Sequence, residues 1–398
     1  MRMCLFSQED IVRPQGGIGT YVRNISIALA ARGHDVHVIA RRRAGEPAFE
    51  QVEGVHLHRV AAPGPPVLYS PLYFRQAARL FRALSAEAPF DVVHGNLPLM
   101  SSWGVSAGLP PVVETVHCTV REELRALSHT ALSQLNFNEV LTRALTPVLY
   151  QRERLLLERA RRVIAVSGGL KRELVEQEGF ADERVEVIPN GIDYRHFAGA
   201  GPEAGATLRR ALGIDPRERV ILYLGRLVER KRAIDLVRAL PAVRRSVPDA
   251  RLVIVGRRNA NAARIARETV RLGVAAYVTQ IDHVAYRDVP AYYAMADVYA
   301  LPSAYEGFPF TVIEAMAAGT PVVASHIRGI DEQVTPLETG LLHPVGDVAA
   351  IAEQLTRALC DRPLAARMAA AAQRMVAARF TWDVIGARTE EVFLRAAA

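Results

Sequence analysis

The stretch SAYEGFPFTVIEAMAAGTPVVAS, residues 303–325, joins a Gly-Phe-Pro turn to a helical pattern and then to a short run rich in valine. The strand-like run DVYALPS, residues 297–303, comes directly before it. A strand, a helix and a second strand in succession form the βαβ unit of a parallel sheet. The stretch therefore predicts an α/β fold, with two glutamates, Glu306 and Glu314, around the start of a helix.

The same alternation of short β-branched runs and longer helical patterns recurs along the whole chain. It includes MCLFS, VHVIA, DVVHG, PVVETVH and RVIAVS in the first half, and RVILYLGRL, RLVIVG, AYVTQ and PVVAS in the second. The alternation pauses where Pro, Gly and Ala cluster between residues 189 and 206. Because 398 residues of which 50% are hydrophobic exceed one typical core, we expect two α/β domains that divide near residue 190.

The composition and charge pattern argue against several classes of protein. The formal net charge is +7, but acids and bases are interspersed, so we expect no nucleic-acid binding. Glu9 and Asp10 interrupt the N-terminal apolar residues and no long uncharged apolar run follows, which predicts a cytoplasmic protein without a leader or membrane span. The cysteines, Cys4, Cys118 and Cys360, lack metal-ligand spacing and are expected to be free thiols.

Residues 121–162 differ from the rest, because leucines and valines recur there among arginines and glutamates at helical spacing. We expect one or two amphipathic helices, and three interpretations stay open. The apolar face packs on its own domain, covers a second substrate, or contacts a membrane surface. The final residues, 381–398, also have helical spacing and are expected to dock on another part of the chain.

A glycine-rich loop, PQGGIGTY at residues 14–21, lies between the first strand and the first helix. It fits a dinucleotide-binding pattern poorly, because Val22 stands where a small residue is required. An anion or sugar contact at Gly16 and Gly17 is one interpretation, and a simple turn is the other.

Two further strand ends carry side chains that are suited to ligand binding. His117 ends the strand PVVETVH, where ligands of open parallel sheets bind, although a lone histidine is also common as a structural residue. Arg226 follows a strand in LGRLVERK, and Lys231, one of only two lysines in the chain, comes five residues later. A guanidinium and an ammonium group at this place suit a diphosphate, whereas a solvated basic turn is the alternative.

The helix that follows Glu306 supplies a second feature suited to anions. Pro309 is expected as the first helical residue, because its missing N–H is tolerated there. The N–H groups of Phe310 and Thr311 then face outward at the positive end of the helix dipole. Glu306 and Glu314 flank this position and are interpreted as acceptors for sugar hydroxyl groups, or alternatively as a loop charge and a surface charge.

These residues together resemble the retaining glycosyltransferases of family 4, which have the GT-B fold. The resemblance spans nearly the whole chain and rests on ordered motifs: GGIG at 16–19, the strand that ends at His117, AVSGGLKREL at 165–174, VIPNGID at 187–193, GRLVERK at 225–231 and EGFPFTVIEAMAAGTPVVAS at 306–325. The last motif matches the E-x7-E element of that family.

The resemblance implies two facing Rossmann-like domains with a cleft between them. Residues 1–190 would form the acceptor-binding domain, completed by a C-terminal helix at 381–398 that returns to it. Residues 191–380 would form the nucleotide-sugar-binding domain. The chain has Arg232 where the family often has glycine, and Cys118 and Thr119 where it often has small residues. The second departure leaves the acceptor side undefined.

The resemblance also implies a role for each matching residue. Arg226 and Lys231 would hold the donor diphosphate and Glu314 the ribose hydroxyls. Glu306 would bind the transferred sugar near its 3- and 4-hydroxyls, and His117 would lie beside the reaction centre. The remaining expected donor contacts are Gly16, Gly17, Phe310 and Thr311.

The expected reaction transfers a hexose of the glucose or N-acetylglucosamine type from a UDP-sugar to a hydroxyl of a small-molecule, lipid or saccharide acceptor. No cofactor and no metal ion are expected, because the sequence contains no Asp-x-Asp pair. Three alternatives stay open: a nucleotide-sugar 2-epimerase of the same fold, a GDP-mannose-dependent transferase, and an inactive binding protein. The arginine-rich composition is typical of a GC-rich bacterium; the acceptor and the oligomeric state are not predicted.

Overall fold

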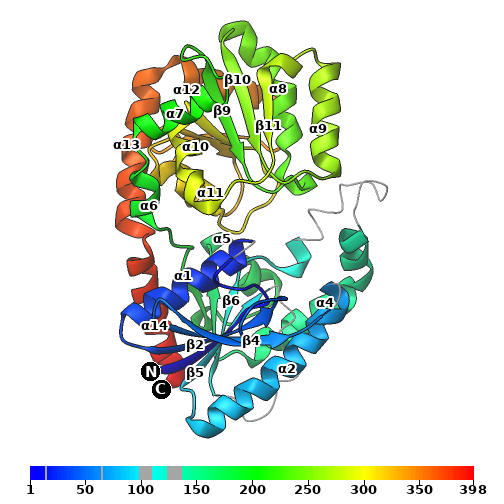
Figure 1. Ribbon diagram of the computed structural model, residues 1–398, viewed down its shortest axis with the longest axis vertical. Helices are drawn as coiled ribbons and strands as arrows, with labels where there is room; N and C mark the ends of the chain where they lie inside the picture. Colours follow the sequence, from blue (N-terminus) through cyan, green and yellow to red (C-terminus); the bar gives the residue numbers. More distant parts are fainter. Residues whose placement is uncertain (14–15, 64–65, 98–109, 123–136) are drawn as a thin grey trace. The chain divides into compact units, whose positions relative to one another are not determined.

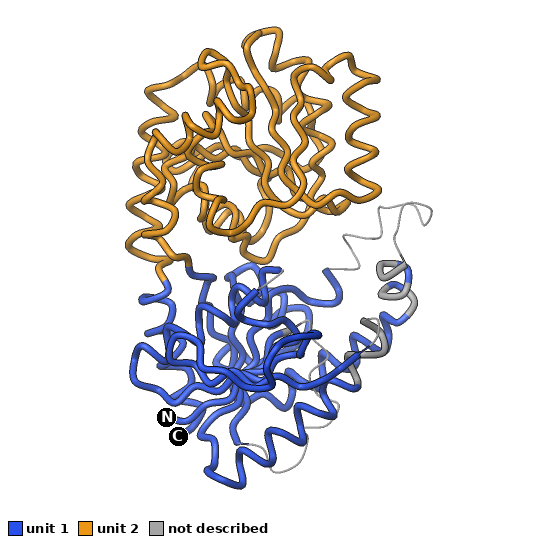
Figure 2. The backbone as a smooth tube through the Cα atoms, in the orientation of Figure 1, with its two compact units in different colours: residues 1–191, 382–398 blue, residues 192–381 orange. Residues whose placement is uncertain are grey.

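The computed structural model describes the chain apart from residues 14–15, 64–65, 98–109 and 123–136 (Figure 1). It divides into two compact units, which Figure 2 shows in different colours. Unit 1 comprises Met1–Gly191 with Trp382–Ala398, and unit 2 comprises Ile192–Thr381. Each unit contains a predominantly parallel sheet with helices packed against it, so the predicted α/β fold is confirmed.

The described part of unit 1 contains an eight-stranded sheet with the order β3-β4-β2-β1-β5-β6-β7-β8. Its strands are β1 (Arg2–Phe6), β2 (Asp35–Arg42), β3 (Phe49–Val52), β4 (Val55–Ala61), β5 (Val92–Leu97), β6 (Val112–Val116), β7 (Arg162–Ala165) and β8 (Val185–Val187). All neighbours pair in parallel except β3 and β4. The strand order changes direction between β1 and β5, which is where open α/β sheets bind ligands.

Helices pack on both faces of this sheet. They are α1 (Gly17–Ala31), α2 (Pro66–Glu87), α4 (Phe137–Arg159), α5 (Gly168–Arg172) and α14 (Trp382–Ala397). Side chains of successive strand residues point to opposite faces. In β5, His94 packs on Phe393 of α14, and Val93 belongs to the apolar cluster around Tyr73 and Phe74 of α2. Helices α14 and α2 therefore cover opposite faces.

The predicted amphipathic stretch is described in part. Residues 123–136, with their apolar positions, lie outside the described residues. Helix α4 buries Leu156 and Leu157 near its C-terminal end, whereas Leu145 and Val148 remain exposed. The interpretation as a helix packed on its own domain therefore holds for the last turns of α4. No helix among the described residues is long and apolar enough to cross a membrane.

Unit 2 contains a six-stranded parallel sheet with the order β11-β10-β9-β12-β13-β14. Its strands are β9 (Arg219–Leu224), β10 (Ala250–Val255), β11 (Val278–Ile281), β12 (Val298–Leu301), β13 (Val322–Ser325) and β14 (Leu341–His343). Its helices are α6 (Tyr194–Ala198), α7 (Pro202–Ala211), α8 (Ala233–Ser246), α9 (Ala260–Arg271), α10 (Val289–Met295), α11 (Phe310–Ala317), α12 (Val348–Cys360) and α13 (Arg362–Arg379). The change in strand direction falls between β9 and β12.

The last helix belongs to unit 1, as the sequence analysis predicts. The Cβ of any residue other than glycine at position 191 would lie 2.6 Å from the ring of Trp382 at the start of α14. The Trp382 ring also meets Tyr21 of α1 edge-on, with a centroid distance of 5.9 Å. Phe393 is fully buried against the His94 ring, 5.2 Å between centroids. Helix α14 is thus part of the core of unit 1.

We expect Phe393→Ala to lower the free energy of unfolding of unit 1 by about 3–5 kcal/mol, because it removes a buried ring and leaves a cavity. The neighbouring Leu394 is 49% exposed, so Leu394→Ala should change stability by less than about 0.5 kcal/mol. Guanidinium denaturation of the two variants measures the difference. Equal stability of the two variants would contradict the role of α14 in the core.

Candidate functional site

The candidate site of unit 2 lies where two loops leave neighbouring strands. Strands β9 and β12 are parallel neighbours, so their carboxyl ends lie at the same edge of the sheet. The loop after β9 contains Arg226 and Lys231, and the loop after β12 contains Glu306. The strand order changes direction between these strands, which makes this edge the expected ligand-binding position.

The start of the loop after β9 is held in place by three side-chain hydrogen bonds. The Tyr223 hydroxyl donates to the carbonyl of Arg226 at 2.9 Å. The side-chain amides of Asn259 and Asn261, at the start of α9, both donate to the carbonyl of Leu227, at 2.8 and 3.0 Å. The backbone path of residues 226–228 is therefore fixed before any ligand binds.

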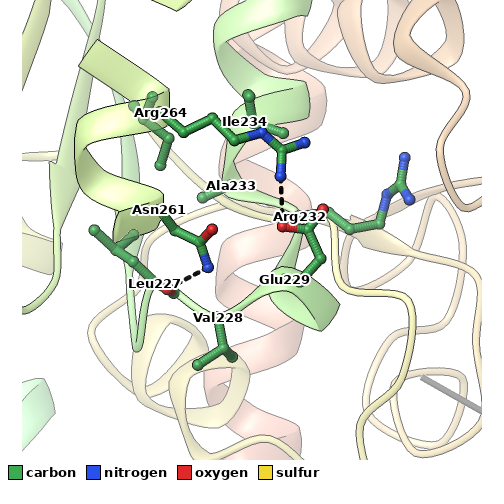
Figure 3. A pocket seen from close by; sticks show the side chains of 9 residues that line it. Leu227, Val228, Glu229, Arg232, Ala233, Ile234, Asn261 and Arg264 are labelled. Atoms are coloured by element: carbon green, nitrogen blue, oxygen red, sulfur yellow. Dashed lines mark hydrogen bonds and ion pairs between the residues drawn. The ribbon is translucent and has the colours of Figure 1, made fainter. Parts of the chain in front are cut away.

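A small hollow adjoins this loop (Figure 3). It is lined by Leu227, Val228, Glu229, Arg232, Ala233, Ile234, Asn261, Arg264 and Ile265. At its rim Arg264 Nη1 and Glu229 Oε2 form an ion pair of 2.8 Å, which Figure 3 marks beside the bond from Asn261. These contacts connect the loop to α9 and add to its rigidity.

The loop ends in a short 3₁₀ turn, Glu229–Lys231, after which Arg232 adopts a left-handed conformation with φ 50°. Glycine adopts this conformation without steric cost, whereas other L-residues lose about 1–2 kcal/mol. The conformation is therefore one that suits the glycine expected at this position from the resemblance. In this protein Arg232 keeps the turn and donates from Nε to Asp235 Oδ2 at 2.7 Å.

Lys231 and Glu306 form a buried ion pair, with 2.7 Å between Nζ and Oε1. Lys231 is 8% exposed and Glu306 is 6% exposed. The Ser303 hydroxyl donates to the same oxygen at 2.7 Å, and Arg230 Nη1 lies 3.5 Å from Oε2. Burial alone would raise the pKa of Glu306, but the positive charges of Lys231 and Arg230 and the hydrogen bonds hold it below its usual value. Glu306 is therefore a carboxylate at neutral pH.

Glu314 lies in the second turn of α11 and has a different environment. Its residue is 9% exposed, and the Tyr293 hydroxyl donates to Oε2 at 2.7 Å. Burial raises the pKa of Glu314 to about 7, and the Tyr293 bond and the charge of Lys231 only partly oppose the shift. The two glutamates thus have pKa values displaced in opposite directions, and neither hydrogen bonds to the other.

Helix α11 begins at Phe310, one residue later than predicted. Pro309 is the N-cap residue rather than the first helical residue, because its ψ of 125° is extended. The carbonyl of Pro309 accepts from Gln333 Nε2 at 3.1 Å, which holds the chain in this orientation. Pro309 supplies no side-chain cap, and Phe310 and Thr311 occupy positions of the first turn of the helix.

Positive charge gathers at this edge of unit 2. Burial lowers the pKa of Lys231, Glu306 raises it, and the charges of Arg230 and Arg226 lower it again, so both arginines lie within electrostatic range of Lys231. The Arg226 side chain is exposed and forms no hydrogen bond or ion pair within the described residues. Three cations against one ionised carboxylate, Glu306, leave a local excess of positive charge.

His117 of unit 1 lies at the carboxyl end of β6. Its Nε2 is 3.2 Å from Asn96 Oδ1, at the end of the neighbouring strand β5, and its ring meets Tyr21 of α1 edge-on at 4.8 Å between centroids. Burial lowers the pKa of His117 to about 3. The imidazole is therefore neutral and is fixed by Asn96 and Tyr21.

Gly16 and Gly19 of the glycine-rich loop lie against an acidic side chain, that of Glu9. The Gly16 N–H donates to Glu9 Oε2 at 2.9 Å. A Cβ at Gly19 would lie 2.2 Å from the same oxygen, so Gly19 is required for this close approach. Gly17 is the first residue of α1 and is exposed. An internal carboxylate thus meets the start of α1, and the donor contacts predicted for Gly16 and Gly17 stay predictions.

Sequence reasoning did not identify five residues that shape these sites: Arg230, Ser303, Tyr293, Asn96 and Glu9. Ser303 precedes Glu306 by three residues, a spacing at which a hydroxyl can turn back to a carboxylate, and this was an available signal. Arg230 lies in the stretch for which a solvated basic turn is the alternative interpretation, and it contacts the Tyr305 carbonyl and Glu306.

Comparison with known proteins gives matches over nearly the whole chain. Residues 15–196 match the model of Glycosyltransferase Family 4, and residues 206–375 match that of Glycosyl transferases group 1. The chain is 30% identical over 424 residues to the glycogen synthase of Mycobacterium tuberculosis, covering 100% of this chain and 95% of that protein. It is 29% identical over 409 residues to a GDP-mannose-dependent alpha-(1-6)-phosphatidylinositol monomannoside mannosyltransferase of the same species, covering 99% and 98%.

Solved structures agree with these matches. The sucrose-phosphate synthase of Thermosynechococcus elongatus has a TM-score of 0.82 and 26% identity, with 100% of both chains covered. HepE of Anabaena, in complex with UDP and glucose, has a TM-score of 0.74, with 98% of this chain and 99% of that chain covered. At 20% identity, the second likeness concerns the fold alone.

We expect Glu314→Gln to stabilise the protein above neutral pH. The pKa of Glu314 is raised from 4.5 to about 7, so the folded state retains a proton that the unfolded state has lost. The penalty is absent below pH 4.5, grows as the pH rises to about 7, and is then constant at about 3 kcal/mol. Glutamine avoids it and still accepts from Tyr293.

Denaturant titrations of the wild type and Glu314→Gln at pH 5 and pH 8 measure this difference. Glu338→Gln is the matched control, because Glu338 is an exposed glutamate of the same unit and its replacement should change stability little. A stability difference for Glu314→Gln that does not change with pH would contradict the raised pKa.

Proposed function

The chain belongs to glycosyltransferase family 4 and has the GT-B fold, and we propose that it transfers a hexose from a UDP-sugar to a hydroxyl group of a small-molecule, lipid or saccharide acceptor. The observation that carries this proposal is the cationic edge of unit 2. There Lys231 pairs with the buried carboxylate of Glu306, Arg230 lies beside the same carboxylate, and Arg226 lies within electrostatic range of Lys231.

Cleavage of the bond between the anomeric carbon and the diphosphate increases the negative charge on the departing UDP. We assign the stabilisation of that charge to Arg226, Lys231 and the N–H groups of Phe310 and Thr311. A fixed donor aimed at developing charge typically lowers the barrier by about 3–4 kcal/mol. These groups supply the positive charge that a divalent metal ion supplies elsewhere, so the proposed reaction requires no metal and no cofactor.

The two glutamates bind hydroxyl groups in this proposal. Glu306 is ionised, and a carboxylate accepts from two adjacent hydroxyls, here the 3- and 4-hydroxyls of the transferred sugar. Glu314 is assigned to the ribose hydroxyls. Hydrogen bonds donated by hydroxyl groups favour the ionised form of a carboxylate. Because the pKa of Glu314 is about 7, donor binding should therefore release protons near neutral pH.

His117 is assigned to the sugar side of the reaction centre. Its pKa of about 3 excludes a role as a general acid near neutral pH, because the imidazole carries no second proton. Since Asn96 Oδ1 accepts from Nε2, Nδ1 is left as a hydrogen-bond acceptor for a hydroxyl. His117 therefore orients a hydroxyl in the proposed mechanism.

We propose retention of the anomeric configuration, with attack from the face that the diphosphate leaves. In this pathway a leaving-group oxygen takes the proton of the acceptor hydroxyl. Lys231 and Ser303 both bond Oε1 of Glu306, and Arg230 lies beside Oε2, which suits a binding group better than a nucleophile. No other carboxylate has an assigned place at the anomeric carbon.

The choice of nucleotide rests on relatives rather than on a residue of this chain. HepE is bound to UDP and glucose, and the mannosyltransferase of Mycobacterium tuberculosis is named for GDP-mannose. UDP is the proposed nucleotide, and GDP-mannose is the alternative donor. A nucleotide-sugar 2-epimerase of the same fold would consume the donor without an acceptor, which separates it from a transferase.

Donor binding tests the proposal directly. UDP, GDP, ADP and their hexose conjugates are titrated against the protein in a thermal-shift assay, and UDP-linked compounds should give the largest stabilisation. A donor at 100 times its dissociation constant adds about 2.7 kcal/mol. Arg226→Gln should weaken diphosphate binding about 10- to 100-fold, because a charged hydrogen bond contributes about 1.5–3 kcal/mol.

Arg226→Gln should not change stability, since the side chain is exposed and has no partner within the described residues. Arg217→Gln is the control, because the Arg217 side chain is 89% exposed in the same unit. Normal diphosphate affinity in Arg226→Gln would remove Arg226 from the site, and no response to any nucleotide diphosphate would refute the proposed function.

Turnover tests the buried pair. We expect Lys231→Gln and Glu306→Gln each to reduce the rate of sugar transfer at least tenfold, because one removes a leaving-group contact and the other a sugar contact. Lys171→Gln is the matched control, since Lys171 is the other lysine of the chain and pairs with Asp182 in unit 1. Circular dichroism verifies folding, and near-normal turnover in either variant would contradict the assigned role.

A further inference from the structure

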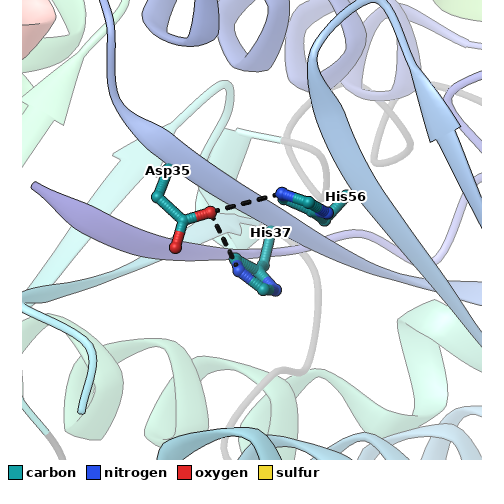
Figure 4. Close-up of side chains that lie close together, drawn as sticks. All are labelled: Asp35, His37 and His56. Atoms are coloured by element: carbon teal, nitrogen blue, oxygen red, sulfur yellow. Dashed lines mark ion pairs between the residues drawn. The ribbon is translucent and has the colours of Figure 1, made fainter. Parts of the chain in front are cut away.

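Three side chains of unit 1 that have no part in the proposed reaction point toward one another (Figure 4). Asp35 and His37 lie on β2, and His56 lies opposite His37 on the parallel neighbour β4. Residues 35 and 37 are two apart on one strand, so they share a face of the sheet. Each of the three side chains offers one possible metal-ligand atom, and these three atoms all lie within 4.8 Å of one another.

The distances suit a tetrahedral metal ion. Asp35 Oδ1 lies 3.1 Å from His37 Nε2 and 3.4 Å from His56 Nε2. In a tetrahedral zinc site, bonds of about 2.0–2.1 Å separate neighbouring ligand atoms by roughly 3.3 Å. Two imidazole nitrogens and a carboxylate oxygen are also ligands that zinc commonly has in proteins.

Two outer contacts orient these ligands. His37 Nδ1 lies 3.0 Å from Nε2 of His58, which is also on β4, so the Nδ1 proton of His37 can be donated there while Nε2 keeps its lone pair. Arg2 Nε donates to Asp35 Oδ2 at 3.1 Å and leaves Oδ1 directed toward the histidines. Histidine ligands of zinc are commonly supported through their second nitrogen in this way.

The group is open to solvent on one side. The His37 side chain is 9% exposed, whereas those of Asp35 and His56 are 45% and 35% exposed. Behind the group, the His37 ring meets Phe90 edge-on at 5.2 Å between centroids. A metal ion can therefore enter from solvent, and water can complete its coordination.

We propose that Asp35, His37 and His56 bind one divalent cation of the zinc class. Asp35 is the first residue of β2 and His56 the second of β4, so the site lies at the amino ends of these strands. The ligand-binding residues of this fold lie at the carboxyl ends of strands. The proposed ion therefore lies at the other ends of these strands and connects β2 to β4.

Zinc binding by the purified full-length protein, without an affinity tag, tests this proposal. Calorimetry with zinc chloride should give one site per chain, and zinc should raise the midpoint of thermal unfolding. Cobalt(II) chloride replaces zinc as a spectroscopic probe and should give the visible absorption bands of a tetrahedral nitrogen and oxygen site. Sugar-transfer activity is not required for either measurement.

Asp35→Asn and His56→Gln should each weaken zinc binding at least tenfold and abolish the cobalt bands. Both side chains are partly exposed, so these variants are expected to fold, and circular dichroism checks this. His326→Gln is the matched control: His326 lies 3.5 Å from Asp331 but belongs to no group of three metal-ligating side chains among the described residues, so its replacement should leave zinc binding unchanged.

A wild-type protein that binds no stoichiometric zinc would overturn the proposal. In that case Asp35 accepts hydrogen bonds from the two imidazoles and the group only pairs two strands. Wild-type affinity in both Asp35→Asn and His56→Gln would likewise exclude the assigned ligands and place any bound zinc elsewhere.

Discussion

The ion pair between Lys231 and Glu306 is the interaction on which the site of unit 2 depends. Each residue is more than nine-tenths buried, and removal of one partner from such a pair leaves an uncompensated charge that costs about 3–5 kcal/mol. The pair therefore ties the loop after β9 to the loop after β12. Ser303 and Arg230 bond the carboxylate as well, which keeps both loops in one arrangement. A diphosphate that binds there meets positive charge that is already oriented.

The two glutamates of the E-x7-E element differ because their neighbours differ. Glu306 has two cations beside it and stays ionised, whereas Glu314 has a tyrosine hydroxyl and a buried setting that raises its pKa to about 7. Eight residues of spacing fix where the two carboxylates lie but not their charge. The same residue type thus provides a permanent acceptor and an acceptor whose ionisation depends on what binds.

Much of this architecture follows from the sequence. Alternating strand and helix patterns predict both sheets, and the motifs at 225–231 and 306–314 identify residues that meet at one sheet edge, since β9 and β12 are neighbours. Contacts that depend on register or on loop shape were not predictable. His37 and His56 become opposite only through the pairing of β2 with β4. Helix α11 begins one residue later than predicted, and Pro309 is its N-cap. A tertiary hydrogen bond from Gln333 holds the Pro309 carbonyl, and the local sequence does not contain this contact.

Two helix starts in this chain have similar sequence signals and different electrostatics. Helix α1 follows a glycine-rich loop, and the carboxylate of Glu9 already accepts from the Gly16 N–H, so the positive end of that helix is neutralised from within unit 1. Helix α11 belongs to the unit that holds Arg226, Arg230 and Lys231. An external anion gains most where no internal carboxylate competes for the helix dipole. This difference favours unit 2 as the place where the donor diphosphate binds.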